Sequence, residues 1–295
     1  TATNWIGTPD GRAGWADYFL TQGYVVYLVD QPARGRSAWR ASVNGPLQVV
    51  PVGTVELRFT APEKFNAWPQ SKLHTQWPGD SDRKGLRGDS IFDAFYATQV
   101  ESLASAVETQ TLVQSAGAAL LDRIGPAIVV THSQAGPFGW LLADVRPSAV
   151  KGIVAVEPNG PPFQNAITGE ERARPWGLTD IALTYDPPIR DVADLRPQRE
   201  EVSDGPNLVA CWRQGTAHRL PHLQGVPILL VTAEASYHAA YDHCTSKYLT
   251  QAGVAHTFTR LEREGIKGNG HMMMLEKNNL AVAAYLQRWL GANVR

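Results

Sequence analysis

The chain has 295 residues, of which 43% are hydrophobic and 19% are charged, and this composition excludes disordered, collagen-like and coiled-coil proteins. Its 27 basic and 28 acidic residues leave a formal net charge of -1, so no global field draws the protein to nucleic acid or to an anionic membrane. No apolar run approaches the roughly 20 residues that span a bilayer, which excludes membrane insertion. A small, neutral partner fits these properties, and the length suits one large α/β domain over residues 1–295.

Short β-branched apolar runs alternate with helical segments along the chain. This alternation predicts a mostly parallel sheet with helices on both faces. The predicted strands cover residues 24–30, 127–131, 152–156, 227–231 and 256–261. The predicted helices cover residues 14–22, 92–124, 138–144 and 280–290.

Two stretches interrupt the alternation and predict insertions over the regular sheet. Residues 40–90 are rich in Pro, Gly and Trp, and residues 159–222 carry many Pro and charged residues with little periodicity. We interpret 159–222 as a cap over a substrate site, the alternative being long surface loops without function. The two cysteines, Cys211 and Cys244, form either one disulfide bond or two buried reduced thiols, and the sequence leaves both open.

Ser133 lies in a turn that predicts a catalytic nucleophile. The turn, residues 131–136 (THSQAG), directly follows a predicted strand and precedes a predicted helix, the context in which a serine is held up on a sharp elbow. Thr131 and Ala135 stand where the common pattern has glycines. The backbone N–H of Gln134 is the expected oxyanion donor at the start of that helix. The alternative is a serine that caps an ordinary helix.

His271 is the predicted general base. It sits in the loop Gly268-Asn269-Gly270-His271, between the last predicted strand and the C-terminal helix, the place where enzymes with a serine on such a strand-turn-helix elbow carry their histidine. Its position distinguishes it from the seven other histidines. These are His74, His132, His218, His222, His238, His243 and His256.

Three carboxylates compete to orient the imidazole. Glu157 follows the strand after the nucleophile, Glu234 follows the next strand, and Asp242 is a more distant third. Most enzymes with such a serine elbow carry the acid after the later of these two strands, which favours Glu234. A glutamate at either position is otherwise an ordinary surface or cap-facing side chain.

Five motifs spread over nearly the whole chain resemble a small, atypical group of α/β-hydrolase carboxylesterases, secreted-type enzymes of bacteria and fungi. They are residues 8–15 (TPDGRAGW), 23–24 (GY), 30–37 (DQPARGRS), 132–134 (HSQ) and 268–274 (GNGHMMM). The resemblance implies the α/β-hydrolase fold and a Ser-His-Glu triad whose acid follows the strand after the nucleophile. That acid is Glu157 here, in the sequence Ala155-Val156-Glu157-Pro158, and the resemblance reverses the choice of Glu234. It also implies a secreted or periplasmic homodimer.

The same resemblance sets expectations for the N-terminus and the substrate pocket. Hydrolases of this kind place an apolar strand and a His-Gly loop upstream of the segment that matches residues 1–15, and that loop donates the second oxyanion amide. We interpret the chain as a downstream fragment in which that donor precedes Thr1, so residues 1–5 are expected near the active site. The expected pocket residues are Thr3, Asn4, Trp5, Trp140 and Phe163. The aromatic residues among them are core residues in the alternative interpretation.

The expected reaction is hydrolysis of a small or medium, apolar or aryl ester through an acyl-enzyme, by a carboxylesterase or lactonase. The alternatives are a lyase or acyltransferase of the same fold and a binding protein without catalysis. The histidines show no metal-ligand spacing and no Gly-rich phosphate loop is present, so no metal or organic cofactor is implied.

Overall fold

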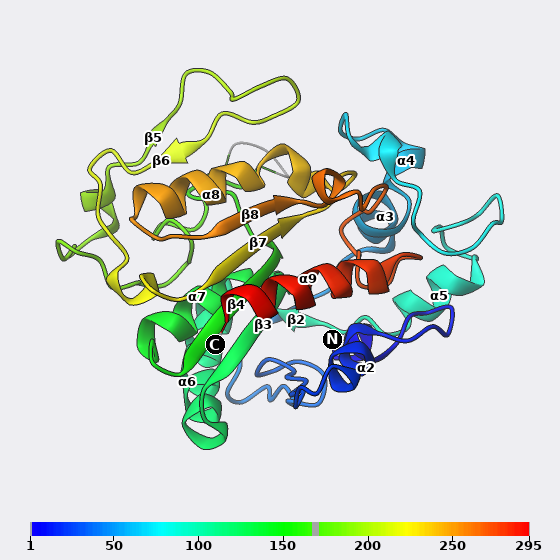
Figure 1. Cartoon of the computed structure of the whole chain (residues 1–295), viewed down its shortest axis with the longest axis horizontal. Coiled ribbons are helices and arrows are strands. Elements are labelled where there is room, and N and C mark those ends of the chain that lie inside the picture. The colour runs from blue at the N-terminus through cyan, green and yellow to red at the C-terminus, as the bar shows by residue number, and fades with distance from the viewer. Residues whose placement is uncertain (1, 167–170, 295) are drawn as a thin grey trace. The chain divides into compact units, whose positions relative to one another are not determined.

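The computed structural model describes residues 2–166 and 171–294, so Thr1, residues 167–170 of the predicted cap, and Arg295 lie outside the described part. Figure 1 shows the helices and strands of the chain, coloured by residue number. By its internal contacts the chain divides into two compact units. Unit 1 comprises Thr1–Ser105, Ala233–Tyr237 and Arg260–Ala292. Unit 2 comprises Ala106–Thr232, His238–Thr259 and Asn293–Arg295.

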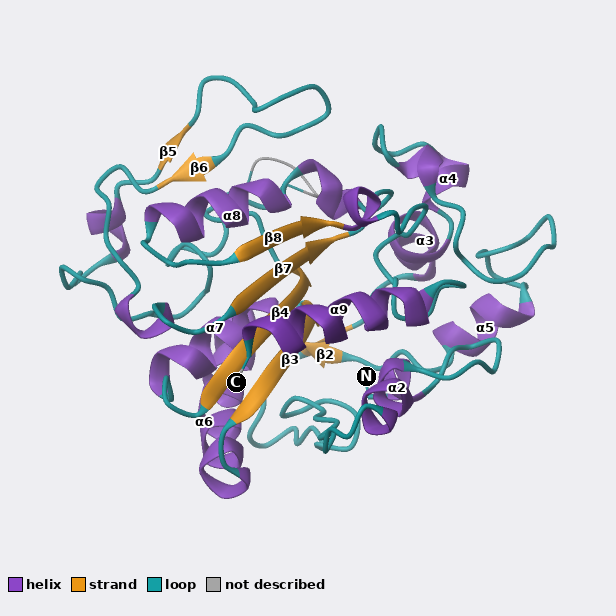
Figure 2. Ribbon diagram, in the orientation of Figure 1, coloured by secondary structure: helices purple, strands orange, loops and turns teal. Residues whose placement is uncertain are grey.

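Unit 2 is built around a four-stranded sheet in the order β3-β4-β7-β8, drawn in orange in Figure 2. The strands are β3 (Ala127–Ser133), β4 (Val150–Pro158), β7 (Ile228–Thr232) and β8 (Thr257–Arg260), the last of which ends one residue beyond the unit. β4 runs parallel to both β3 and β7. All four strands were predicted from their short β-branched runs, and these predictions are confirmed.

Three helices of unit 2 flank these strands in the chain: the first precedes β3, the second connects β3 to β4 and the third connects β7 to β8, as parallel strands require crossover connections. They are α6 (Ala106–Ile124), α7 (Gly136–Val145) and α8 (Asp242–Gln251). α7 packs against β3 and β4, and α6 packs against α7. The hydrophobic core of the unit forms between these layers because β4 is apolar on both faces and buried along almost its whole length.

A disulfide bond joins Cys211 to Cys244 within unit 2, which decides between the two states that the sequence leaves open. Cys211 directly precedes β6 (Trp212–Arg213), which pairs antiparallel with β5 (Gln198–Arg199), and Cys244 lies in α8. The bond therefore ties residues 198–213, part of the irregular insertion, to a helix of the core. The rest of the described insertion is mostly turns, with the short helices η3 (Val192–Leu195) and η4 (Pro221–Leu223).

Unit 1 consists of short elements and long connections. Its helices are α1 (Thr3–Ile6), α2 (Trp15–Thr21), α3 (Val52–Val55), η1 (Glu56–Thr60), α4 (Pro62–Phe65), η2 (Ser71–Leu73), α5 (Ser90–Tyr96), η6 (Leu261–Glu264) and α9 (Asn279–Asn293), whose last residue belongs to unit 2. Its two-stranded sheet pairs β1 (Leu47–Gln48) antiparallel with β2 (Ser102–Leu103). The C-terminal helix was predicted, and its extent is confirmed to within a few residues.

The predicted strand over residues 24–30 is wrong for the described part of the chain. The segment is assigned neither strand nor helix, and Val25, Tyr27 and Val29 are 79%, 55% and 61% exposed. A β-branched run becomes a strand only when a neighbouring strand supplies its hydrogen bonds, and residues 24–30 join no ladder in this structure.

The predicted single helix over residues 92–124 is also wrong. α5 ends at Tyr96 and α6 begins at Ala106, and β2 lies between them. Residues 98–105 include Thr, Val and two Ser, whose stiff or hydrogen-bonding side chains compete with helix formation, so pairing with β1 prevails there.

Within the two described stretches, no helix has the length and apolar character needed to cross a membrane.

The disulfide bond is expected to stabilise unit 2 because it closes a long loop, with a sequence separation of 33 residues. Replacing both cysteines with serine should lower the free energy of unfolding by about 3 kcal/mol, measured by urea titration. Reduced wild-type protein should unfold like the double variant. An unchanged urea midpoint in the variant would show that the bond contributes nothing to stability.

Candidate active site

Ser133 ends β3 in a left-handed backbone conformation, with φ of 55°. A non-glycine residue in this region of backbone space costs about 1–3 kcal/mol and occurs preferentially at functional sites. The N–H of Ala135 donates to the carbonyl of His132 at 3.0 Å, and α7 begins at the next residue, Gly136. The predicted sequence of strand, sharp turn and helix is therefore present around the serine.

Gly136 lets this turn pass close to the end of β4. A Cβ atom placed on Gly136 would collide with the backbone and side chain of Pro158. The same approach allows the N–H of Asn159 to donate to the carbonyl of Ser133 at 2.8 Å. Gly136 is thus the position in this elbow that needs a residue without a side chain. Positions 131 and 135 accommodate the side chains of Thr131 and Ala135.

Glu157 occupies a β-bulge at the end of β4, beside the nucleophile strand. The strand register moves from His132 opposite Val156 to Ser133 opposite Pro158, so Glu157 is the extra residue between them. Its φ is 43° and its side chain is fully buried. Because a bulge redirects a side chain, this local irregularity gives a buried carboxylate an orientation that a regular strand would not.

His238 lies close to Glu157 within unit 2 and contacts Asp242. A ring nitrogen of His238 and a carboxylate oxygen of Glu157 lie within 4.8 Å of each other. The Nδ1 atom of His238 is 2.9 Å from the Asp242 carboxylate, which also accepts a hydrogen bond from the Thr232 hydroxyl at 2.6 Å. Asp242, the third candidate acid in the sequence, is therefore the partner of a different histidine.

Sequence reasoning missed His238. The signal available was the spacing of His238 and Asp242, four residues apart, which places two side chains on one face of a helical segment. Nothing in that spacing alone indicates which carboxylate the ring would meet on another strand.

His271 lies in unit 1, almost completely buried among aromatic rings. Its Nε2 atom is 3.1 Å from the Tyr237 hydroxyl, and its ring centroid lies 4.7 Å from that of Tyr237 and 5.1 Å from that of Phe59. Glu234 approaches the same loop but binds its backbone, because its carboxylate accepts a hydrogen bond from the N–H of Gly268 at 2.8 Å.

The loop that carries His271 is fixed by a buried carboxylate. Glu276 accepts hydrogen bonds from the N–H of Gly270 at 2.8 and 3.1 Å and from the Asn269 side chain at 2.7 Å. Asn269 and Asn278 exchange two further side-chain hydrogen bonds of 2.6 and 2.9 Å. These contacts fix Asn269 and Gly270, the two residues before His271. The network therefore determines the backbone position from which the His271 side chain extends.

His74 connects this network to a second carboxylate. Its Nε2 atom lies 2.8 Å from Glu276 and its Nδ1 atom lies 2.7 Å from Glu63. Burial alone would lower the pKa of His74, but the hydrogen bonds and negative charges of Glu276 and Glu63 outweigh burial and raise its pKa to about 9. A buried imidazolium thus lies between two carboxylates and satisfies both.

A group of three side chains in unit 2 consists of residue types that can bind metal ions. Cys211, His243 and Cys244 bring one such atom each to within 4.8 Å of the others. Both sulfur atoms belong to the disulfide bond, so they do not offer the thiolates that a zinc site of this kind requires.

Comparison with known proteins connects this geometry to an enzyme family. The atomic-resolution structure of a novel bacterial esterase matches with a TM-score of 0.59 at 22% sequence identity, covering 100% of this chain and 78% of that one. The probable secreted lipase phiG of Fungal sp. (strain ATCC 74256) is 47% identical over 291 residues, covering 98% of this chain and 78% of the relative. The chain belongs to the lipase and esterase family of α/β-hydrolases. No family model matches it.

Membership of the lipase and esterase family confirms the fold class and the family resemblance that the motifs indicate. The parallel sheet of unit 2 with its flanking helices is the core of an α/β-hydrolase, and the protein is a carboxylesterase-type hydrolase. The roles of individual residues stay predictions.

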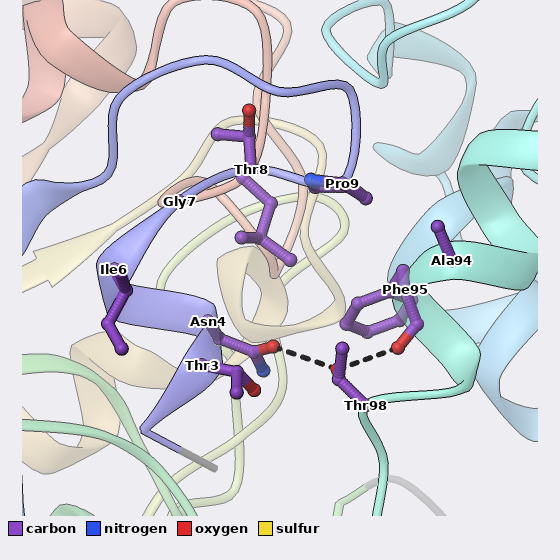
Figure 3. Close-up of a pocket in the computed structure, with 10 residues that line it drawn as sticks. Thr3, Asn4, Ile6, Gly7, Thr8, Pro9, Ala94, Phe95 and Thr98 are labelled. Atoms are coloured by element: carbon purple, nitrogen blue, oxygen red, sulfur yellow. Dashed lines mark hydrogen bonds between the residues drawn. The ribbon is translucent and has the colours of Figure 1, made fainter.

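Two residues predicted to line the esterase pocket, Thr3 and Asn4, line a cavity of about 270 Å³ in unit 1 (Figure 3). Asn4 accepts a hydrogen bond from the Thr98 hydroxyl at 3.2 Å, and Phe95 and Leu275 lie on the cavity wall. Leu275 follows His271 by four residues in the same unit.

The three aromatic residues predicted for the pocket contact other aromatic or apolar groups. The Trp5 ring lies 5.6 Å from that of Trp15. Trp140 on α7 is buried in the hydrophobic core of unit 2, and so is Phe163, whose ring lies 5.6 Å from that of Tyr248. Trp140 and Phe163 are thus packed core side chains, whereas Trp5 is half-buried, and a role in substrate binding stays a prediction for all three.

The charged network around His74 predicts a pH-dependent stability. Because the folded pKa of about 9 exceeds that of an unfolded histidine, the stabilisation is complete below about pH 6.5 and is lost as pH rises through about 9. The difference in free energy of unfolding between wild type and His74→Gln should therefore shrink between about pH 6 and about pH 10, measured by urea titration.

Thr60→Val is the matched control for this measurement. It removes a buried hydrogen bond of 2.6 Å to the carbonyl of Gly85, also in unit 1, without removing a titratable group. Its destabilisation should stay constant over the same pH range. A constant difference for His74→Gln as well would contradict the charged state of His74.

Proposed function

We propose that this esterase-family protein hydrolyses carboxylic esters with Ser133 as nucleophile, His271 as general base and Glu157 as the acid that orients the base. The observation that carries the proposal is the left-handed backbone of Ser133 at the end of β3, directly before α7. A family relationship to a lipase at 47% identity supports the reaction class. Neither a helix cap nor an ordinary connection requires a serine in that conformation.

The proposed reaction proceeds in two half-reactions. His271 accepts the proton of the Ser133 hydroxyl through Nε2 while the serine oxygen bonds to the ester carbonyl carbon, and the N–H of Gln134 donates to the resulting oxyanion. The protonated His271 then gives its proton to the departing alcohol as the carbon–oxygen bond breaks, which leaves an acyl-enzyme. Water, deprotonated by the same base, releases the acid and restores Ser133.

The surroundings of Glu157 in unit 2 and of Glu234 in unit 1 both support the choice of Glu157 as the acid. Glu157 is fully buried at the carboxyl end of the strand beside the nucleophile strand, in a bulge that redirects its side chain. Glu234 already accepts a hydrogen bond from the N–H of Gly268, and Asp242 is engaged by His238 and Thr232. Glu234 in this account supports the backbone of the His271 loop instead of its ring.

The proposed substrates are small or medium esters with apolar or aryl groups. Their supporting features are the apolar character of the Thr3 and Asn4 cavity wall, the aromatic rings around His271 and the name of the lipase relative. Residues 159–222 are proposed as the cap that limits substrate size. A lactone, an internal ester, would react by the same steps, whereas a lyase or acyltransferase of this fold would have to exclude water from the acyl-enzyme.

Secretion is supported by the disulfide bond, since such bonds form in oxidising compartments, and by the name of the relative. The motif resemblance alone supports a homodimer. Both are part of the proposal.

Turnover of p-nitrophenyl butyrate tests the assignment of the triad. Ser133→Ala should reduce kcat by at least about 10⁴-fold, since covalent catalysis is lost. Glu157→Gln should reduce kcat by about 10³-fold or more, because the imidazolium loses its counter-charge. Glu234→Gln, the matched control, should retain kcat within about tenfold, because only one backbone hydrogen bond is weakened.

The reverse order of the two glutamate variants would restore Glu234 as the acid. Unchanged turnover in Ser133→Ala would contradict the proposed nucleophile.

A further inference from the structure

Tyr237 places its hydroxyl at the nitrogen of His271 that the proposed mechanism uses for proton transfer. The two residues lie in the same unit, and the Tyr237 hydroxyl is 3.1 Å from Nε2 of His271. No other role in the proposed mechanism accounts for a hydroxyl at this atom. Its position was also not signalled by any sequence motif.

The tyrosine ring is held firmly in this position. It stacks on Phe59 with ring centroids 6.5 Å apart and meets the edge of Trp68 at 5.9 Å. The indole N–H of Trp68 donates to the carbonyl of Ala235 at 3.0 Å, two residues before the tyrosine. Because ring and backbone are both fixed, the hydroxyl is preorganised toward Nε2, as an effective catalytic donor must be.

The protonation of His271 changes what this hydroxyl can do during the reaction. With the imidazole neutral and its proton on Nδ1, Nε2 accepts a hydrogen bond from the Tyr237 O–H. Because Nε2 has one lone pair, it must release the Tyr237 O–H to take the serine proton, and once protonated it is a donor that no longer accepts that bond. The Tyr237 O–H must then find another acceptor.

The departing alcohol oxygen is the acceptor that the reaction supplies. To receive the proton from Nε2, this oxygen must come within about 3 Å of Nε2. The hydroxyl of Tyr237 already lies at that distance from Nε2. The Tyr237 oxygen and the departing alcohol oxygen would therefore lie close to each other. A phenol O–H at that place donates to the negative charge that develops on the leaving oxygen.

We propose that Tyr237 is a catalytic residue that donates a hydrogen bond to the leaving-group oxygen, and that the natural substrates are therefore esters of alkyl alcohols. Esters of this class need such help because alkoxides are poor leaving groups, whereas nitrophenolate departs readily without it. No proton is consumed in this step, since His271 supplies the proton and Tyr237 keeps its own. The proposal rests on the proposed role of His271 as the base.

A series of butyrate esters that differ only in the alcohol tests the proposal. Ethyl, phenyl and p-nitrophenyl butyrate share one acyl group, so kcat/KM compares the step in which the alcohol leaves. Tyr237→Phe should lower kcat/KM for ethyl butyrate by about 10- to 100-fold, the effect of one hydrogen bond to a charged group. The loss for p-nitrophenyl butyrate should stay within about threefold, because little charge on that oxygen needs stabilisation.

Tyr248→Phe is the matched control, because it removes another buried tyrosine hydroxyl, one that bonds Tyr185 at 2.7 Å in unit 2. Its ratio of ethyl to p-nitrophenyl activity should equal that of the wild type. Tyr237→Phe keeps the ring and its contacts with Phe59 and Trp68, so its melting temperature should equal that of the wild type, which separates loss of the hydroxyl from loss of the fold.

Equal losses for all three esters, or no loss for any, would overturn the role of Tyr237. Failure of the underlying esterase proposal would look different. In that case the wild type would hydrolyse none of the three esters, or Ser133→Ala would hydrolyse them as well as the wild type does.

Discussion

The close approach of Gly136 to Pro158 is the constraint on which the candidate site depends. It lets the chain turn back at the end of β3, so Ser133 adopts a left-handed backbone and α7 starts immediately afterwards. The same contact point is where β4 bulges at Glu157, so the geometries of the serine and of the buried carboxylate are determined together. The cost of two residues with positive φ is offset by the surrounding parallel strands and by the packing of α7 on them.

A second constraint governs the loop of His271 in unit 1. Buried charge is tolerated there because each charged group has hydrogen-bonded partners of opposite sign, with the imidazolium of His74 between Glu63 and Glu276. Glu276 in turn accepts from the two residues that precede His271. Polar networks of this kind specify one conformation when every member is satisfied, and a loop flanked by glycines needs that specification to aim its imidazole.

The sequence predicted the parts of the fold that depend on local pattern. β3, β4, β7 and β8 were predicted from short β-branched runs, and the turn around Ser133 was predicted because a strand, a turn and a helix follow one another within a few residues. Residues 24–30 have the same apolar pattern and are not a strand, because a strand also needs a partner that no local pattern reveals. The same reason explains the error at residues 92–124. The local pattern predicted one helix there, but pairing of β2 with β1 interrupts it.

The side chains that support the site were beyond sequence reasoning because their contacts join distant segments. His74 meets Glu276 across 202 positions, and Tyr237 meets His271 across 34. The acid could be ranked from the family resemblance, but the binding of Glu234 to the Gly268 backbone became visible only in three dimensions. Trp140 and Phe163 lie in the hydrophobic core, as large aromatic residues near motifs often do, and their role in substrate binding stays a prediction.

Mass spectrometry of the protein after reaction with a fluorophosphonate tests the central claim most directly, because such reagents bond to activated serine oxygens. We expect a single adduct, located by peptide mapping on Ser133, that forms much more slowly in His271→Ala. An adduct on another serine, or equally fast labelling of Ser133 in His271→Ala, would contradict it.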